Sequence, residues 1–279
     1  MNSDTHTPTI ASTLTRLLAQ GLDRLDAQLL LLHVLQQSPH NRAWLMAHDT
    51  DPIGPTALQQ LSDLTLRRQR GEPLAYLTGH KEFYGLDLRV DARVLVPRPD
   101  TETLVDWALE VLQAQDTAEV LDLGTGSGAI ALALKHTLPD LNVSAIDYSA
   151  DALAVASANA ARLHLAVSFQ QGSWLDGVSA RYQLIVSNPP YIAAQDQHLS
   201  ALTFEPLQAL TSGVDGLDDI RRIIRQAPAR LQAGGWLLLE HGYDQAPAVR
   251  ALLHEAGFCD VQSRLDLSDI ERCSGGKLA

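Results

Sequence analysis

Several features that define other classes of protein are scarce in this chain. It has only two cysteines, Cys259 and Cys273, and their spacing suits neither a disulfide framework nor a metal-ligand cluster. The ten histidines form no HxH or HExxH group, so we expect no metal site. Hydrophobic runs are short, as at residues 29–32, whereas a membrane span needs about 20 apolar residues. The polar N-terminus lacks a signal-peptide pattern, and we therefore expect a cytoplasmic protein with no membrane partner.

Positive charge is also scarce. Lys and Arg total 21 against 33 Asp and Glu, a net charge of −12, and nearly all of the acidic excess lies after residue 80. Proteins that hold nucleic acids through their phosphates need clustered basic residues. The nearest approach here, Arg67, Arg68 and Arg70, is typical of a solvated helix face. We therefore expect no direct binding of nucleic acid, while a hydrophobic share of 46% is ample for a packed core.

The first part of the chain, residues 1–75, has the pattern of a small helical domain. Its leucines recur at spacings of three and four, as on the buried face of a helix. Asp23 and Pro55 stand where a helix N-cap and a first-turn proline are expected. Residues 76–97 then alternate between apolar and polar positions, which predicts a β-hairpin linker.

Residues 98–279 alternate between strand-like and helical segments. This succession predicts an α/β domain with a parallel sheet and helices on both faces. The strand-like segments are residues 119–123, 142–147, 167–171, 182–187 and 235–240. The helical segments are residues 129–137, 149–163, 217–232 and 244–256. The pattern of residues 258–279 is weaker and leaves the strands of that segment open.

A glycine-rich loop connects the first of these strands to the helix that follows it. The loop residues are Gly124, Thr125, Gly126, Ser127 and Gly128. Such a loop lets a ligand touch the backbone, and Asp147 at the end of the next strand is placed to accept hydrogen bonds from ribose hydroxyls. The pattern also fits a dinucleotide site. Asp122, which we expect at the mouth of the loop, favours S-adenosylmethionine because its charge would repel a pyrophosphate and attract a sulfonium and an ammonium group.

A second motif, Asn188-Pro189-Pro190-Tyr191, follows the apolar strand at residues 182–187. Two prolines cannot continue a sheet ladder, so the chain must leave as a stiff, extended segment. The Pro189 carbonyl and the Asn188 side-chain carbonyl then offer two acceptors at a fixed angle, which suits the two hydrogens of a planar NH₂ group. Tyr191 can stack on the flat face of that amide or base. On its own the motif is typical of a rigid loop; with the glycine loop upstream it indicates catalysis by positioning.

Together these motifs resemble those of methyltransferases that act on the N6 of adenine or the N5 of glutamine. Two further stretches, GEPLAYLTGHKEFYGLDLRV (71–90) and VLVPRPDTETLVDWAL (94–109), resemble the bacterial protein-(glutamine-N5) methyltransferases that modify peptide chain release factors. The resemblance covers nearly the whole chain, including FEPLQAL (204–210) and LLLEHG (237–242). One departure lies at the C-terminus, where ERCSGGKLA replaces the usual E-R-x-x-x-G-R strand and puts the final strand in doubt.

The resemblance implies a five-helix, substrate-recognising N-terminal domain, a hairpin, and a seven-stranded, Rossmann-like class I methyltransferase domain. It implies S-adenosylmethionine as the cofactor, held by residues Gly124 to Gly128, Asp147 and Trp174, with Asn188 also in contact. Asn188, Pro189, Pro190 and Tyr191 would hold the substrate, the glutamine of the Gly-Gly-Gln motif in release factors. Asn188, Pro189 and Tyr191 are the expected catalytic residues of this translation-termination enzyme, which we expect to act as a monomer.

Other polar residues are weaker candidates. Arg98, Asp100 and Glu102 are typical of an ion-pair set that joins two domains, and His198 and His241 are typical of surface or structural histidines. Three rival functions stay open. The chain can be a glutamine methyltransferase of a ribosomal protein, a DNA N6-adenine methyltransferase, which the acidic charge disfavours, or a non-catalytic factor that holds a translation partner.

Overall fold

The computed structural model describes residues 7–113 and 117–279 and separates into two compact units, Met1–Gly79 and His80–Ala279. The boundary follows α5, so Tyr76–Gly79 of the expected linker belong to the helical unit and the hairpin belongs to the second.

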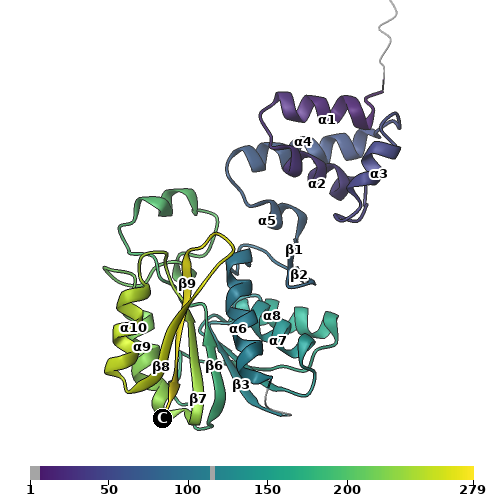
Figure 1. Ribbon diagram of the computed structural model, residues 1–279. Helices are drawn as coiled ribbons and strands as arrows, with labels where there is room; N and C mark the ends of the chain where they lie inside the picture. Colours follow the sequence, from purple (N-terminus) through teal and green to yellow (C-terminus); the bar gives the residue numbers. More distant parts are fainter. Residues whose placement is uncertain (1–6, 114–116) are drawn as a thin grey trace, which may run out of the picture. The chain divides into compact units, whose positions relative to one another are not determined.

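The helical unit contains five helices within its described residues (Figure 1). They are α1 (Ile10–Ala19), α2 (Arg24–Val34), α3 (Arg42–Ala47), α4 (Pro55–Gln69) and α5 (Leu74–Thr78). The Asp23 side chain accepts a hydrogen bond from the Leu25 N–H and caps α2, and Pro55 occupies the first turn of α4, as the sequence predicts. Three leucines of α2, Leu30, Leu31 and Leu32, are fully buried in the core of this unit. Arg67 and Arg68 pair with Glu72 and Asp26, so these arginines are part of a solvated helix face.

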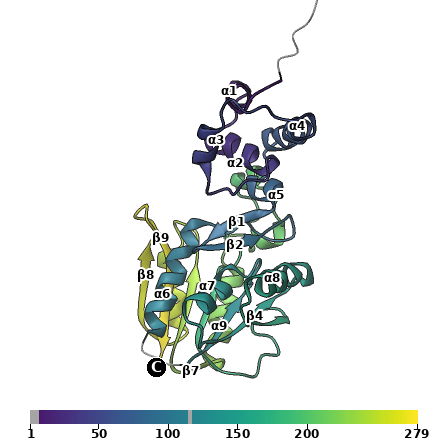
Figure 2. The same cartoon turned by 90° about the vertical axis from the view of Figure 1, so that its right-hand side faces the viewer.

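The second unit begins with an antiparallel hairpin of β1 (His80–Phe83) and β2 (Leu86–Arg89). Its second strand lies against α8 (Ala150–Leu163) (Figure 2). There the Asn159 side chain accepts a hydrogen bond from the Arg89 N–H and donates one to the Arg89 carbonyl. A short 3₁₀ turn, η1 (Pro99–Thr101), then leads into α6 (Glu102–Leu112). Phe83 is buried in the same core cluster as α6, so the hairpin is an integral part of this unit.

A seven-stranded sheet forms the centre of the second unit, in the order β5-β4-β3-β6-β7-β9-β8. Its strands are β3 (Glu119–Leu123), β4 (Asn142–Asp147), β5 (Ser168–Gln171), β6 (Tyr182–Ser187), β7 (Leu231–Glu240), β8 (Phe258–Leu265) and β9 (Glu271–Leu278). The first five strands are parallel, while β9 runs antiparallel to β7 and β8 antiparallel to β9. The five strands that the sequence predicts are parallel, as expected, and β8 and β9, from the segment that the sequence leaves open, make the sheet mixed at this edge.

Helices cover both faces of the sheet, as the alternating pattern predicts. Alternate residues of a strand face opposite sides, and Val120 joins a core cluster with α6 and α7 (Ala129–Thr137) whereas Leu121 joins one with α9 (Asp218–Gln226) and α10 (Ala246–Glu255). Figure 1 shows α9 and α10 on one side and α6 and α7 on the other. Three short 3₁₀ segments complete the unit: η2 (Gln197–Ala201), η3 (Leu207–Ala209) and η4 (Ala227–Ala229).

The C-terminal segment forms a regular strand despite its glycines. A Cβ atom on Gly275 would lie 2.5 Å from Leu238 Cδ2 and 2.6 Å from the Leu237 carbonyl oxygen, so only glycine lets β9 approach β7 this closely. The doubt that the sequence raises about ERCSGGKLA is thereby resolved, because tertiary contact with β7 rather than local propensity forms this strand.

The strand order reverses at β3. The chain continues from β3 to β4 and β5 on one side, then returns to add β6 on the other. In open α/β sheets, ligands bind at such a switch point, outside the carboxyl ends of the strands. The loops that follow β3 and β6 contain the glycine-rich motif and the Asn-Pro-Pro-Tyr motif, so the topology brings the two motifs together.

Candidate functional site

A cavity of about 260 Å³ opens at the carboxyl ends of β3, β4, β5 and β6. Six residues that the sequence singles out line it: Gly124, Gly126, Asp147, Trp174, Asn188 and Pro190. The other five, Thr125, Ser127, Gly128, Pro189 and Tyr191, are not among its lining residues. The cavity therefore joins both motifs and the ends of two further strands.

The glycine loop depends on backbone conformations that favour glycine. Gly124, Gly126 and Gly128 have φ values of +68°, +56° and +86°. A Cβ atom on Gly128 would come within 3.0 Å of Leu132 and 3.3 Å of Ala156, so this glycine permits close packing of α7 and α8. The first two glycines, in contrast, face the cavity and leave the backbone open to a ligand.

Asp147 closes one side of the loop. Its carboxylate accepts a 2.8 Å hydrogen bond from the Gly126 N–H and a 2.9 Å bond from the Ser149 N–H, one on each oxygen. Burial raises the pKa of Asp147, while hydrogen bonds from these two N–H groups and from that of Tyr148 oppose the shift. Each oxygen keeps a lone pair, so a carboxylate fixed in this position can accept hydrogen bonds from a vicinal pair of hydroxyls.

Asp122 does not lie where the charge argument places it. Its side chain is 1% exposed, lies beneath the loop and is not part of the cavity lining. One oxygen, Oδ2, accepts bonds from the Thr125 hydroxyl at 2.6 Å and the Ala131 N–H at 3.2 Å, so Asp122 holds the loop to the start of α7. Burial raises its pKa to about 7, mainly by desolvation. Asp122 therefore does not present a fully charged carboxylate at the cavity that could select a cationic ligand.

Trp174 lies against the glycine loop. Its indole N–H donates a 2.9 Å hydrogen bond to Asp219 Oδ1, which fixes the ring at the cavity wall. A Cβ atom on Gly124 would lie 3.3 Å from the ring carbon Cζ3, so the loop and the indole are in close contact. The backbone of Trp174 has a φ of +52°, a conformation that is rare outside glycine and is often found at functional sites.

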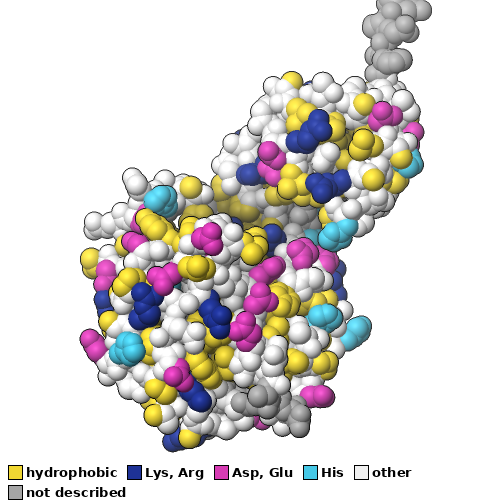
Figure 3. Space-filling model, in the orientation of Figure 1, with side chains coloured by type: hydrophobic (Ala, Val, Ile, Leu, Met, Phe, Trp, Pro, Cys, Tyr) yellow, Lys and Arg dark blue, Asp and Glu magenta, His cyan; other side chains and the backbone are white. Residues whose placement is uncertain are grey.

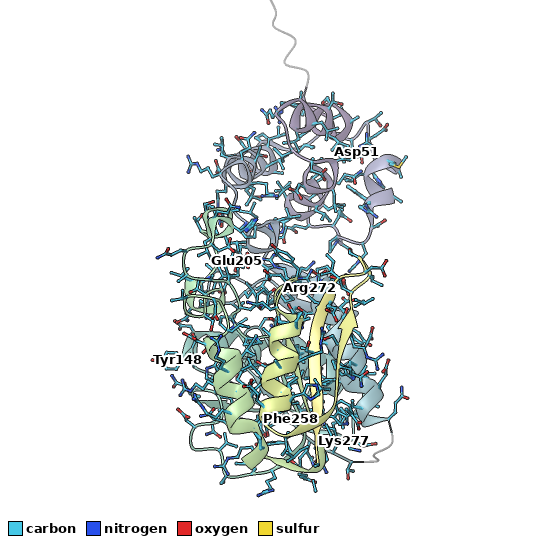
Figure 4. The ribbon with its side chains drawn as sticks, turned by 60° about the vertical axis from the view of Figure 1, so that its left-hand side comes forward. Asp51, Tyr148, Glu205, Phe258, Arg272 and Lys277 are labelled. Carbon is cyan, nitrogen blue, oxygen red and sulfur yellow. The ribbon has the colours of Figure 1, made fainter. Side chains whose placement is uncertain are left out.

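These residues fit S-adenosylmethionine. Asp147 presents a fixed carboxylate suited to a ribose, and Gly124 and Gly126 expose backbone where a ligand can approach closely. Ile146, Tyr148 and Trp174 supply apolar and aromatic surface suited to an adenine ring. Tyr148 is 72% exposed, and Figure 4 shows its side chain at the outer edge of the molecule in that view. Buried Asp122 Oδ1 accepts no hydrogen bond from the described residues, which leaves an unused acceptor beneath the loop.

The Asn-Pro-Pro-Tyr segment faces the same cavity through Asn188 and Pro190. The Asn188 amide nitrogen Nδ2 donates a 3.2 Å hydrogen bond to the Thr101 hydroxyl oxygen. With its nitrogen bound to Thr101, the amide has its oxygen Oδ1 left to accept hydrogen bonds from a ligand. The segment can therefore offer a carbonyl acceptor at the cavity, as the sequence argument requires.

Tyr191 lies on the side of the segment away from the cavity lining. It packs against the core of the sheet, and its hydroxyl donates a 3.3 Å hydrogen bond to Glu240 Oε1. Burial and the neighbouring Glu240 raise the pKa of Tyr191 well above its usual value. Gln245 donates a 3.0 Å bond to the Tyr191 carbonyl and fixes the backbone. In this geometry Tyr191 anchors the segment.

The weaker candidates have structural partners. Arg98 pairs with Glu205, Asp100 lies 3.2 Å from Arg272, and Glu102 accepts a bond from the Tyr84 N–H. All these partners belong to the second unit, so the set joins segments within that unit rather than two domains. His198 is exposed beside Asp196, and fully buried His241 bonds Ser274 and the Gly242 carbonyl.

Several residues at or near the site were not predicted from the sequence to belong to it. Tyr148 and Asp219 line the cavity, and Glu240 and Thr101 form the buried polar group behind Asn188. Tyr148 and Glu240 carry a usable signal, because each stands at or just after the carboxyl end of a buried strand. Asp219 and Thr101 carry none, since only the tertiary fold brings them to the site.

The distribution of charge, possible metal ligands and possible membrane helices were each compared with the expectations from the sequence. On the face in Figure 3, Lys and Arg side chains are interspersed with Asp and Glu. Within residues 7–113 and 117–279, no cluster of three or more His, Cys, Asp or Glu could hold a metal ion. No helix in those ranges is long and apolar enough to cross a membrane.

A mixed seven-stranded sheet with this loop and cavity defines a class I methyltransferase that depends on S-adenosylmethionine, and the comparisons with known proteins agree. The methyltransferase small domain matches residues 101–261, and the PrmC N-terminal domain matches residues 10–79. Among solved structures, the 16S rRNA N2 G1207 methyltransferase of Thermus thermophilus, in complex with AdoMet and guanosine, aligns with a TM-score of 0.54 at 19% identity. This alignment covers 72% of this chain and 50% of that one. A ribosomal protein L11 methylase from Lactobacillus delbrueckii gives a TM-score of 0.50 at 22% identity over 68% of this chain and 86% of that one. These two alignments show that the chain shares the fold of the two solved structures.

Similarity in sequence is much closer to proteins called release factor glutamine methyltransferase. The protein of that name from Bordetella pertussis is 52% identical over 92% of this chain and 96% of its own length. The one from Burkholderia pseudomallei is 46% identical over 100% of this chain and 99% of its own. The chain belongs to the family of release factor glutamine methyltransferases, which confirms the resemblance found in the sequence.

Proposed function

We propose that this chain transfers a methyl group from S-adenosylmethionine to the N5 side-chain amide of the glutamine in the Gly-Gly-Gln motif of release factors. The observation that supports this most directly is the orientation of Asn188, whose amide nitrogen is held by Thr101 at the cavity wall. The names of the relatives from Bordetella and Burkholderia support the choice of a release factor as the substrate.

Catalysis in this proposal is mainly positioning. Asn188 Oδ1 and the Pro189 carbonyl accept hydrogen bonds from the two N–H groups of the glutamine amide and fix its plane. Pro189 and Pro190 stiffen the segment, and Gln245 and Glu240 hold Tyr191 at its end. Holding two reacting groups in one geometry converts a bimolecular step into an effectively unimolecular one. The amide keeps its proton until after attack, so no strong base is needed beforehand.

The cofactor site in this proposal is the glycine loop with its neighbours. Asp147 binds the ribose hydroxyls, the backbone at Gly124 and Gly126 lies against the ligand, and Trp174 flanks the adenine. When bound, S-adenosylmethionine supplies an electrophilic methyl group on a sulfonium. Thr125, Ser127 and Gly128 act indirectly. Thr125 bonds Asp122, the Ser127 carbonyl accepts a hydrogen bond from Asn159 of α8, and Gly128 permits the close packing of α7 and α8.

The helical unit binds the body of the release factor in this proposal. None of its described residues lines the cavity, and it has its own hydrophobic core and matches a separate family domain. All residues of the proposed site lie in one unit of one chain, which supports activity as a monomer. A substrate that works on the ribosome places the enzyme in the cytoplasm.

Incubation with methyl-labelled cofactor tests the proposal against its rivals. Purified release factor, ribosomal proteins and DNA are offered separately, and mass spectrometry locates the label. We expect label on the glutamine of the release factor, with the whole factor a better substrate than a short peptide from its glutamine loop. Label on a ribosomal protein or on DNA would assign the chain to a rival class, and no label on any of them would favour a non-catalytic factor.

A further inference from the structure

We infer that Glu240 is a positioning residue that, through Thr101, sets which end of the Asn188 amide faces the substrate. This inference rests on the proposed function and adds a residue to it. The two ends of an asparagine amide are nearly identical in shape, and only their hydrogen-bond partners decide which is which. A site that must accept hydrogens from a glutamine NH₂ group needs the oxygen, rather than the nitrogen, of Asn188 at the cavity.

Asn188 is joined to Thr101 by a hydrogen bond. Asn188 Nδ2 donates to Thr101 Oγ1 at 3.2 Å, so the threonine oxygen acts as the acceptor. A hydroxyl that accepts from one neighbour still has a proton of its own to donate. Thr101 is 4% exposed, so a group inside the protein has to accept that proton.

The acceptor beside Thr101 is the Glu240 carboxyl. Glu240 is 1% exposed at the end of β7, and its oxygen Oε2 has no hydrogen-bond partner among the described residues. The Thr101 hydroxyl interacts with this carboxyl and lowers its pKa. Tyr191 donates its own proton to the other oxygen, Oε1. An ionised carboxylate can only accept, so the unpartnered Oε2 is available to take the Thr101 proton, and the threonine oxygen is then left as an acceptor for Asn188.

Burial and the neighbouring groups together determine the pKa of Glu240. Burial raises its pKa to about 7, Arg272 and the hydroxyls of Thr101 and Tyr191 lower it, and Asp100 raises it. Arg272, labelled in Figure 4, stands in the adjacent strand β9. When Glu240 is protonated it can donate to the Thr101 oxygen. The Thr101 hydroxyl can then donate to Asn188 instead of accepting from it, which would turn the amide nitrogen of Asn188 toward the cavity. The activity of the wild-type chain should therefore fall as the pH drops below this pKa.

Two variants test the inference directly. Glu240→Gln replaces an acceptor with a group that can also donate, and Thr101→Val removes the acceptor of the Asn188 amide while keeping the shape. We expect each to lower kcat for the release factor about a hundredfold, as misplacement of a reacting group does. The affinity for S-adenosylmethionine should stay near that of wild type, and Glu240→Gln should flatten the acid limb of the pH profile of kcat.

Three comparisons separate positioning from a loss of structure. Thr101→Ser keeps the hydroxyl and should retain activity. The double variant Glu240→Gln with Thr101→Val should be no worse than either single variant, because both act through Asn188. Thr13→Val is the matched control, since Thr13 is a buried threonine of the helical unit whose hydroxyl has no partner among the described residues; it should have no effect on kcat.

The preference of the chain for a glutamine over a glutamate substrate depends on the orientation of the Asn188 amide and can therefore be used to measure it. The wild-type chain should bind a release factor with glutamine in its loop better than one with glutamate, because Oδ1 accepts hydrogens and repels a carboxylate. In Glu240→Gln this preference should shrink, since the nitrogen can now face the ligand. If Glu240→Gln and Thr101→Val both keep the wild-type kcat and the wild-type preference for glutamine over glutamate, the inference is overturned. The proposed function is not affected by that result. Absence of methylation by the wild-type chain would instead overturn the proposed function and this inference with it.

Discussion

Ser187 and Leu123 are bound to each other where the two functional loops begin. The Ser187 hydroxyl donates a 2.7 Å hydrogen bond to the Leu123 carbonyl, and both residues are fully buried. They are also paired in the register of β6 and β3. The next residues along the chain are Asn188 and Gly124, so this contact fixes the spacing between the substrate motif and the cofactor loop.

Removal of that contact should loosen the site. Ser187→Ala should lower the free energy of unfolding by about 1 kcal/mol, the usual net contribution of one hydrogen bond. It should also lower kcat, because the two loops are then less firmly spaced. Urea unfolding and steady-state kinetics measure the two effects. Ser200→Ala is the control, since Ser200 makes a similar 2.8 Å bond to a backbone carbonyl but on the surface; equal effects of both substitutions would contradict this role.

Crowding at the glycine loop can be separated from backbone strain. Gly124→Ala adds a Cβ atom 3.3 Å from Trp174 Cζ3 at a φ of +68°, whereas Gly257→Ala imposes similar strain at a φ of +86° with no atom within 4 Å. Both should lose stability by about 1 kcal/mol. Only Gly124→Ala should also weaken cofactor binding, measured by calorimetry. Normal cofactor affinity in Gly124→Ala would show that the ligand does not lie against this backbone.

The carboxylate of Asp147 should matter for cofactor affinity. Asp147→Asn replaces one oxygen that accepts from Gly126 or Ser149 with a nitrogen that cannot accept. We expect about 2 kcal/mol of lost binding free energy for S-adenosylmethionine, as for a hydrogen bond to a charged group. Equilibrium binding of the cofactor measures this loss. Asp140→Asn, on the surface after α7, should bind the cofactor normally; equal affinities in the two variants would exclude Asp147 from the cofactor site.

The buried carboxyl of Asp122 predicts a specific dependence of stability on pH. Its pKa is about 7 in the folded chain against an ordinary value of 3.8, so the folded state binds this proton more tightly than the unfolded state. Between these pKa values, stability must fall as the pH rises. The wild-type chain should therefore lose free energy of unfolding relative to Asp122→Asn when both are unfolded in urea at about pH 4, 5.5 and 7. A difference that stays constant over this range would contradict the shifted pKa.

The sequence predicted the elements around the site better than the contacts within it. The glycine loop, Asp147 and the Asn-Pro-Pro-Tyr motif are short segments next to apolar strands, so local pattern and strand topology bring them together. The burial of Asp122, the bond of Tyr191 to Glu240 and the bond of Asn188 to Thr101 could not be predicted, because each depends on side-chain packing. Gly275 in β9 shows the same limit, since its strand depends on close contact with β7.

In the proposed function, Asn188 orients the glutamine amide and contributes little to binding of the cofactor. The direct measurement compares wild type and Asn188→Ala under single-turnover conditions, with labelled S-adenosylmethionine and release factor both bound. The account predicts a loss of methyl transfer to the glutamine of at least about a hundredfold with nearly unchanged cofactor affinity. Transfer by Asn188→Ala at the wild-type rate would contradict it.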